Sequence, residues 1–253
     1  MKRTLTILTP ITLALALGAC AGGKLNPDAL VQTGSLAMKA ATLSDADVKS
    51  LSAQACAQSD KQSKIAPAGN KYAKRLVKVV KPFGNNLDGQ PLNFKVYLTS
   101  DVNAWAMANG CVRVYSGLMD KMNDDELRGV IGHEIGHVAL GHSKKAMQTA
   151  YAVSAARSAA AASGNATVTA LSTSQLGDLT EKLINAQFSQ SQESAADDYS
   201  FDLLTRKGMK REGLVTAFQK LADMDGGQSS MMSSHPGSAA RAKHIQDRLA
   251  SGK

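Results

Sequence analysis

The fold is decided by the stretch Gly129-Val130-Ile131-Gly132-His133-Glu134-Ile135-Gly136-His137-Val138, which sets a His-Glu-x-x-His pentapeptide in an apolar, helix-compatible run. On a helix, His133 and His137 are one turn apart and leave the same face. That spacing suits two ligands of one tetrahedral zinc ion. Glu134 can then lean toward the open coordination position and take a proton from water. The alternative is a pair of histidines satisfied inside a helix core, and the flanking sequence has to decide between the two.

Composition favours a mainly helical protein. The 253-residue chain can bury a sizeable core, and its aromatic content of 4 % is low for a β-sandwich. The net charge of +8 would permit contact with acidic surfaces. However, the basic residues are dense only over 71–81, and no aromatic-interleaved motif accompanies them. We therefore expect a solvated basic face and no nucleic-acid partner.

The N-terminus predicts a targeting signal. Lys2 and Arg3 precede a short apolar run, which ends in Leu17-Gly18-Ala19-Cys20. That ending resembles the bacterial lipobox, which implies removal of residues 1–19 and lipidation of Cys20. Ala21 stands where an Asp would retain such lipoproteins in the inner membrane, so we expect an outer-membrane anchor with the protein facing the periplasm. An ordinary secretory signal with an incidental cysteine is the alternative.

Residues 20–69 are expected to form the lipid anchor and an N-terminal helical region, and residues 70–253 the main domain. Ser44 is a candidate N-cap for a helix that extends to about Ser59. Cys56 and Cys111 remain for a disulfide, which an oxidising periplasm would favour. Two separate free thiols are the alternative.

A small antiparallel sheet is expected just before the pentapeptide. Residues 93–98 alternate polar and apolar side chains, and residues 111–115 form a second β-rich run. Between them, Asn103, Ala104, Trp105 and Ala106 form our candidate edge strand, because an exposed edge can pair with an extended peptide substrate. A simple hairpin that covers the pentapeptide helix is an equally open interpretation.

The residues around the pentapeptide narrow the class of metal site. Asn123 and Glu126 form a capping box for a helix that we expect to run through His142 to about Met147. The metzincin pattern needs a glycine and a histidine where this chain has Leu140 and Ser143, so that class is excluded. His142 would point off the ligand face, as a neighbour of the site rather than a ligand.

The third ligand should therefore come from a later helix. Glu193 and Asp197 are four residues apart and share one helical face. Glu193 could coordinate zinc while Asp197 holds the far nitrogen of a ligating histidine. A surface glutamate would be the default interpretation of Glu193 if it stood alone.

These features together resemble the HtpX-type gluzincin metalloproteases, over about Lys71 to Leu249. The motifs that carry the resemblance are His133-Glu134-Ile135-Gly136-His137, Glu193-x-x-Ala196-Asp197, Ser234-His235-Pro236 with Arg241, Asn103-Ala104-x-Ala106 and Tyr115-Ser116-Gly117-Leu118. The lipobox and the lack of transmembrane segments make the chain similar to the periplasmic lipoprotein branch of that family.

The resemblance implies His133, His137 and Glu193 as ligands of one Zn²⁺ ion and Glu134 as general base and acid. It also implies that His235 lies near the metal, where it could stabilise an oxyanion or gate access, and that Arg241 orients the site. From the residues alone, His235 would be a loop histidine.

We therefore expect an α+β, mainly helical, zincin-like metalloprotease domain with its small sheet beside the His-Glu-x-x-His helix. The expected function is a zinc endopeptidase for misfolded or misassembled envelope proteins, in possible contact with other envelope proteases or assembly factors. A chaperone-like binding module with latent protease activity is the alternative. A purely structural zinc is disfavoured, since only three ligands are visible.

As a hypothesis, the Ala/Ser-rich segment 150–173 forms helical structure that controls entry to the cleft, although ordinary packed helices would also explain it.

Overall fold

The computed structural model describes residues 42–87, 89–161, 173–224 and 230–252. The predicted signal peptide, Cys20 and residues 162–172 of the Ala/Ser-rich segment lie outside the described residues. Within the described ranges, no helix is long and apolar enough to cross a membrane.

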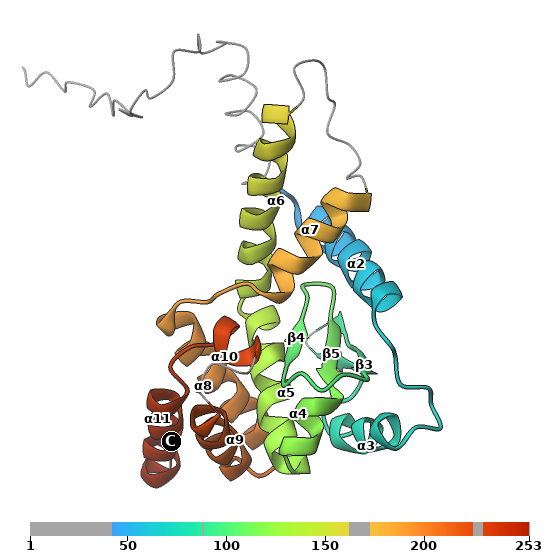
Figure 1. Cartoon of the computed structure of the whole chain (residues 1–253). Helices are drawn as coiled ribbons and strands as arrows, with labels where there is room; N and C mark the ends of the chain where they lie inside the picture. Colours follow the sequence, from blue (N-terminus) through green and yellow to red (C-terminus); the bar gives the residue numbers. More distant parts are fainter. Residues whose placement is uncertain (1–41, 88, 162–172, 225–229, 253) are drawn as a thin grey trace, which may run out of the picture.

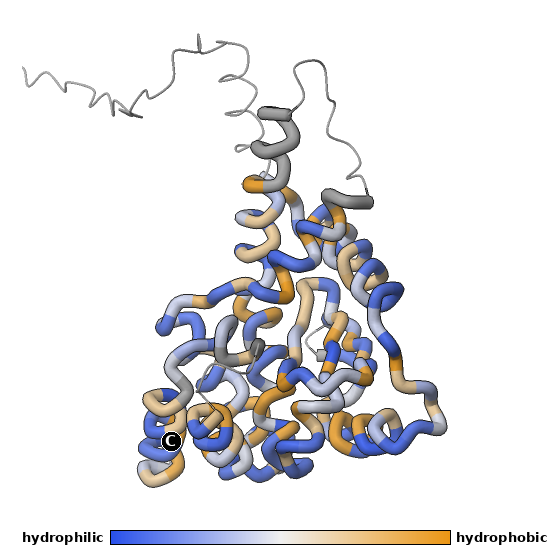
Figure 2. The backbone as a smooth tube through the Cα atoms, in the orientation of Figure 1, coloured by the Kyte–Doolittle hydropathy of each residue, from blue (hydrophilic) through white to orange (hydrophobic). Residues whose placement is uncertain are grey.

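The described chain is mainly helical, as the composition predicts (Figure 1). Its helices are α2 (Asp45–Gln62), α3 (Lys71–Val80), α4 (Ser116–Lys121), α5 (Asp124–Ala139), α6 (His142–Ala161), α7 (Thr173–Ile184), α8 (Gln190–Arg206), α9 (Glu212–Asp223), α10 (Ser230–Ser234) and α11 (Ser238–Ser251). The predicted caps are confirmed: the Ser44 side chain caps α2, and Asn123 forms a capping box with Glu126 at the start of α5. Hydrophobic and hydrophilic segments alternate along several helices, as expected where one face of a helix is buried (Figure 2).

The small sheet is mixed, so the prediction of an antiparallel sheet was wrong. Strands β3 (Asn93–Tyr97), β4 (Ala104–Ala106) and β5 (Cys111–Tyr115) are arranged in the order β3-β5-β4. β4 pairs antiparallel with β5, whereas β3 pairs parallel with β5. Side-chain alternation reports which face of a strand is buried but not the strand's direction. The short strands β1 (Asn86–Leu87) and β2 (Gln90–Pro91) form a separate antiparallel pair.

The pentapeptide helix is shorter than predicted. α5 ends at Ala139, Leu140 is its C-cap, and His142 begins a new helix. Gly141 has a φ of +73°, and its N–H donates to the Val138 carbonyl. A left-handed glycine after the last turn is a common helix terminator, which explains why the chain turns here although no proline interrupts it.

Glycines let α5 lie very close to its neighbours α8 and α9. A Cβ atom added at Gly132 would lie 2.5 Å from Ser200 Oγ on α8. One added at Gly136 would lie 3.0 Å from the Ala196 carbonyl oxygen, and one at Gly129 would lie 2.8 Å from Leu214 Cα on α9. The two histidines of α5 therefore face α8 at a short backbone separation.

The N-terminal helix α2 is attached to the sheet by a disulfide bond and by an ion pair. The disulfide Cys56–Cys111 joins α2 to β5, which confirms the predicted pairing. Beside it, Arg113 is 1 % exposed and donates from Nε to Asp60 at 2.8 Å. Although partial burial opposes it, hydrogen bonds from Arg113, Lys95 and the Tyr97 hydroxyl lower the pKa of Asp60 to about 2.

Helices α2, α6 and α7 pack together on the side of the sheet where the β4–β5 turn projects (Figure 1). Val48 of α2, Met147 of α6 and Leu179 of α7 are each at most 1 % exposed and share one apolar cluster. This three-helix group forms a wall near the pentapeptide helix, and part of the Ala/Ser-rich segment belongs to it as the second half of α6.

Candidate metal centre and active site

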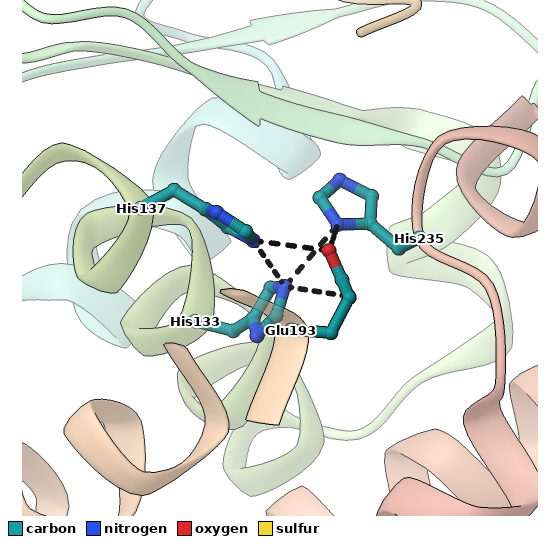
Figure 3. A group of neighbouring side chains, drawn as sticks. All are labelled: His133, His137, Glu193 and His235. Carbon is teal, nitrogen blue, oxygen red and sulfur yellow. Dashed lines mark hydrogen bonds and ion pairs between the residues drawn. The ribbon is translucent and has the colours of Figure 1, made fainter. Parts of the chain in front are cut away.

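Four side chains from three parts of the chain converge in the interior (Figure 3). His133 and His137 come from α5, Glu193 from α8, and His235 follows α10. Their potential ligand atoms all lie within 4.8 Å of one another, and each residue is at most 4 % exposed. The predicted three-ligand set is therefore together, and His235 is part of the same cluster.

The spacing of these atoms fits a single metal ion. His133 Nε2 lies 3.0 Å from His137 Nε2 and 3.2 Å from His235 Nδ1, and Glu193 Oε1 lies 3.3 Å from His137 Nε2. A tetrahedron with ligand distances of roughly 2.0–2.1 Å has edges of about 3.3 Å. The donor set, three imidazole nitrogens and one carboxylate, is also the chemistry that zinc and related metals accept.

Asp197 and Arg241 contact the residues of this cluster and hold them in place. Asp197 Oδ1 lies 2.8 Å from His133 Nδ1, the nitrogen that faces away from the cluster, as the spacing with Glu193 predicts. Arg241 donates from Nε and Nη2 to the two Asp197 oxygens at 2.8 and 2.7 Å, and its Nη1 lies 2.6 Å from Glu193 Oε2. The positive charge of this guanidinium compensates the negative charges of the two buried carboxylates, which would otherwise repel each other.

The protonation states of His133, His137 and Glu193 suit a metal, whereas, although burial opposes it, the charges of Glu134 and Glu193 raise the pKa of His235. Burial, helped by the Arg241 charge, lowers the pKa of His133 well below its ordinary value. Burial likewise lowers the pKa of His137 to about 4. For Glu193, burial acts in the opposite direction, but hydrogen bonds from His137 and His235 hold its pKa well below the usual range. Neutral imidazoles and an ionised carboxylate are the forms that bind metal.

Glu134 lies beside the donor set without belonging to it. It is 3 % exposed, its Oε1 makes no hydrogen bond with any residue that the structure describes, and His235 Nε2 lies 3.4 Å from that oxygen. Burial raises the pKa of Glu134 to about 7, although the Ala106 N–H donates to its carboxylate. A buried carboxyl group with a free oxygen is suited to accept and return a proton.

Two aromatic rings, of His142 and Phe188, flank His137, and only the first was predicted from the sequence. His142 Nδ1 lies 3.0 Å from His137 Nδ1, outside the donor set, as predicted. Phe188 stacks on the His137 ring at a centroid distance of 3.9 Å and was missed. Its position just before the Glu193 helix was the available signal, because the start of α8 has to pass the metal cluster.

The candidate edge strand lies at an edge of the sheet, since β4 pairs only with β5 among the described strands. Asn103, Ala104 and Trp105 are nevertheless buried, and Ser143 Oγ donates to the Ala106 carbonyl at 3.3 Å. Ala106, in contact with Glu134 through its N–H, connects this edge to the metal cluster. Pairing of this strand with a substrate stays a prediction.

A His-Glu-x-x-His helix completed by a glutamate from a later helix defines a metallopeptidase of the gluzincin type. Comparison with known proteins agrees. Residues 67–249 match peptidase family M48, and the chain belongs to that family.

The chain is similar over its full length to two proteins of Escherichia coli (strain K12). It is 53 % identical to the metalloprotease YcaL over 255 aligned residues, and this alignment covers 100 % of both chains. It is 54 % identical to the metalloprotease LoiP over 244 aligned residues, and this alignment covers 96 % of both chains. A more distant relative, the beta-barrel assembly-enhancing protease of Yersinia pestis, is 27 % identical over 164 residues, covering 60 % of this chain and 34 % of that protein. The resemblance stated from the motifs is confirmed, and the chain is a metalloprotease.

Proposed function

We propose that this protein is a zinc endopeptidase that cleaves misfolded or misassembled proteins of the cell envelope. The observation that carries the proposal is the buried carboxyl of Glu134, whose Oε1 makes no hydrogen bond within the described chain and lies beside the convergent His133, His137 and Glu193 donors. Zinc held by these donors would supply a Lewis acid for the scissile carbonyl and for the attacking water.

The chain's own residues have distinct tasks in this reaction. Glu134 accepts a proton from the attacking water at its free Oε1 and delivers a proton to the leaving amine. Asp197 accepts from His133 Nδ1, which fixes the tautomer that presents Nε2 to the cluster. Arg241 binds both Asp197 and Glu193 and thereby keeps the two carboxylates in place.

His235 gives the cluster a fourth protein donor, in addition to the three ligands predicted from the sequence. Four protein ligands are typical of structural zinc sites, so this observation favours a structural metal as the second candidate function. Glu134 argues for catalysis, because a purely structural site does not need a buried carboxyl group with a raised pKa beside its donors.

The location is part of the proposal. The Leu17-Gly18-Ala19-Cys20 lipobox supports a lipid anchor at Cys20 in the outer membrane, facing the periplasm. The disulfide Cys56–Cys111 is consistent with an oxidising compartment. A relative named as a beta-barrel assembly-enhancing protease supports substrates or partners in envelope assembly. Mass spectrometry of the mature N-terminus tests the anchor, and an unmodified Cys20 thiol would refute it.

The decisive experiment compares the full chain with its Glu134→Gln variant. We expect the variant to retain one zinc per chain by elemental analysis and to lose cleavage of casein, because it keeps the ligands but lacks the proton acceptor. Glu212→Gln, an exposed change at the start of α9, is the control and should cleave like the parent. Casein cleavage by Glu134→Gln at the parent rate would refute the mechanism and leave the structural metal as the better explanation.

A further inference from the structure

Helix α3 carries a row of lysines on its outer side. Residues 71–81 contain no Asp or Glu, and their lysines follow one another at intervals of three or four residues: Lys71, Lys74, Lys78 and Lys81. These intervals place the four side chains on one side of the helix, along about 15 Å of its axis. All four are exposed, and we call this set the lysine face.

The inner side of α3 is firmly attached to the body of the protein, at whose periphery the helix lies (Figure 1). Leu76 and Val79 are at most 3 % exposed and belong to the main apolar core. Arg75 donates from Nη2 to the Met122 carbonyl at 2.5 Å, which ties the helix to the end of α4. Because α3 is held on this side, the lysine face stays turned outward.

The fold itself gains nothing from the lysine face. Lys71 and Lys74 lie at the start of α3, where the helix dipole disfavours positive charge and where the first turn has no acidic residue. Like charges three or four residues apart on a helix also repel each other. The Asp124 carboxylate is already bound by Arg75 at 2.8 Å, and Lys78 lies 3.6 Å from it. Apart from Lys78, the lysine face forms no ion pair with any residue that the structure describes. A partner that supplies negative charge would compensate this repulsion.

An apolar side chain lies beside the lysines. Val77 is 69 % exposed, more than any other large apolar side chain that the structure describes. Helices that lie on a membrane combine lysines on the polar side with apolar side chains that enter the headgroup region. Lysine binds a phosphate as a point charge and needs no shaped pocket for it. The combination therefore favours a lipid surface over an acidic protein as the partner.

We propose that the lysine face of α3 binds an anionic phospholipid surface, with Val77 inserted among the headgroups. This contact does not depend on the proposed peptidase function. It adds a second membrane contact to the anchor proposed at Cys20. The anchor would hold the chain near a membrane, whereas the lysine face would determine which side of the domain lies against it.

The test is co-sedimentation with vesicles of phosphatidylcholine, either alone or with about 30 % phosphatidylglycerol. The protein is the mature chain from residue 20 with Cys20→Ser, so that it carries no lipid. We expect binding only to the vesicles with phosphatidylglycerol, and weaker binding at high salt, because salt screens the lysine charges. Lys74→Gln with Lys81→Gln should weaken this binding about thirtyfold, since each lysine near an anionic surface contributes about fivefold. The control, Lys61→Gln with Lys207→Gln, removes the same charge from exposed positions elsewhere and should weaken it about twofold at most.

A second variant tests the apolar part of the contact. Val77→Ser leaves the charge unchanged and should lower the affinity for the same vesicles about fivefold, because its side chain no longer enters the headgroup region. Equal binding to both kinds of vesicle would refute the proposal, and so would an equal loss in the lysine-face variant and its control. Binding to soluble polyglutamate but not to vesicles would identify an acidic protein as the partner and would also overturn it. Cleavage of soluble casein should be unchanged in all these variants, which separates the outcome from that of the peptidase test.

Discussion

The close contact between α5 and α8 can be tested with a compensating pair of substitutions. Gly132 immediately precedes the cluster residue His133, and a Cβ added there would lie 2.5 Å from Ser200 Oγ. Ser200 follows Asp197 by less than one turn and donates from Oγ to the Gly129 carbonyl at 2.9 Å. Gly132→Ala should therefore push apart the two helices that carry the donors, and removal of the Ser200 hydroxyl should relieve the clash.

The magnitudes follow from three contributions. Replacing a mid-helix glycine by alanine stabilises by about 1 kcal/mol, whereas forcing an extra carbon into a packed interior costs up to about 3 kcal/mol. Gly132→Ala should thus destabilise by about 2 kcal/mol, and Ser200→Ala by about 1 kcal/mol for its lost hydrogen bond. In the double variant the new Cβ would lie 3.4 Å from the Cβ of residue 200, an ordinary contact. Its stability should therefore lie within about 1 kcal/mol of the parent, some 3 kcal/mol better than additivity.

The assay is thermal unfolding of the parent, both single variants and the double variant, followed by circular dichroism in the presence of a chelator. A loss of about 2 kcal/mol should lower the midpoint of Gly132→Ala by roughly 4–8 °C in a chain of this size. Casein cleavage should fall and recover in parallel, because Glu193 and Asp197 move with α8. Gly177→Ala, in a helix where an added Cβ would meet nothing within 4 Å, is the control and should be stabilising. Strictly additive effects of the two substitutions would refute the proposed contact between the helices.

Three further predictions concern other parts of the molecule. Removal of the disulfide by Cys56→Ala with Cys111→Ala opens a loop with a sequence separation of 55 residues. It should lower the free energy of unfolding in urea by about 4 kcal/mol in the chain-entropy model, and an unchanged midpoint would contradict this. Asp60 has a folded pKa of about 2, below its ordinary 3.8, so its charge stabilises the fold above about pH 4 and this gain disappears as the pH falls to 2. Asp60→Asn should therefore be about 1 kcal/mol less stable at pH 6, allowing for solvent screening, and the difference should close by pH 2, whereas a constant difference would exclude the charge as its cause. Arg241→Lys keeps the charge but loses the paired bonds to Asp197, so chelator competition should show metal affinity reduced by roughly 10–100-fold, and parent-like affinity would show that the paired geometry is unimportant.

The parts of the fold that could be predicted from the sequence are those that local chemistry determines. Ser44 and Asn123 cap helices where expected because an N-cap needs only its own side chain and the next turn of backbone. The direction of β3 and the end of α5 could not be predicted in this way. The first depends on where the chain re-enters the sheet, and the second on Gly141, which an uninterrupted helix would also tolerate at modest cost.

The same distinction explains which site residues were found. His133, His137, Glu193 and Asp197 occur as pairs at helical spacing, so each pair carries its own geometric signal. His235 and Arg241 have no such spacing to the pentapeptide, and only family resemblance singled them out. Phe188 carries no signal beyond its position just before the Glu193 helix, since an isolated Phe is ordinary until the fold stacks it on a residue such as His137. The buried Arg113 is a comparable case, because its charge is tolerable in a strand only where α2 supplies Asp60 from 53 residues earlier. Residues that act through long-range contacts are therefore the ones that the structure adds, and in this chain several of those contacts involve α2, outside the segment that matches the protease family.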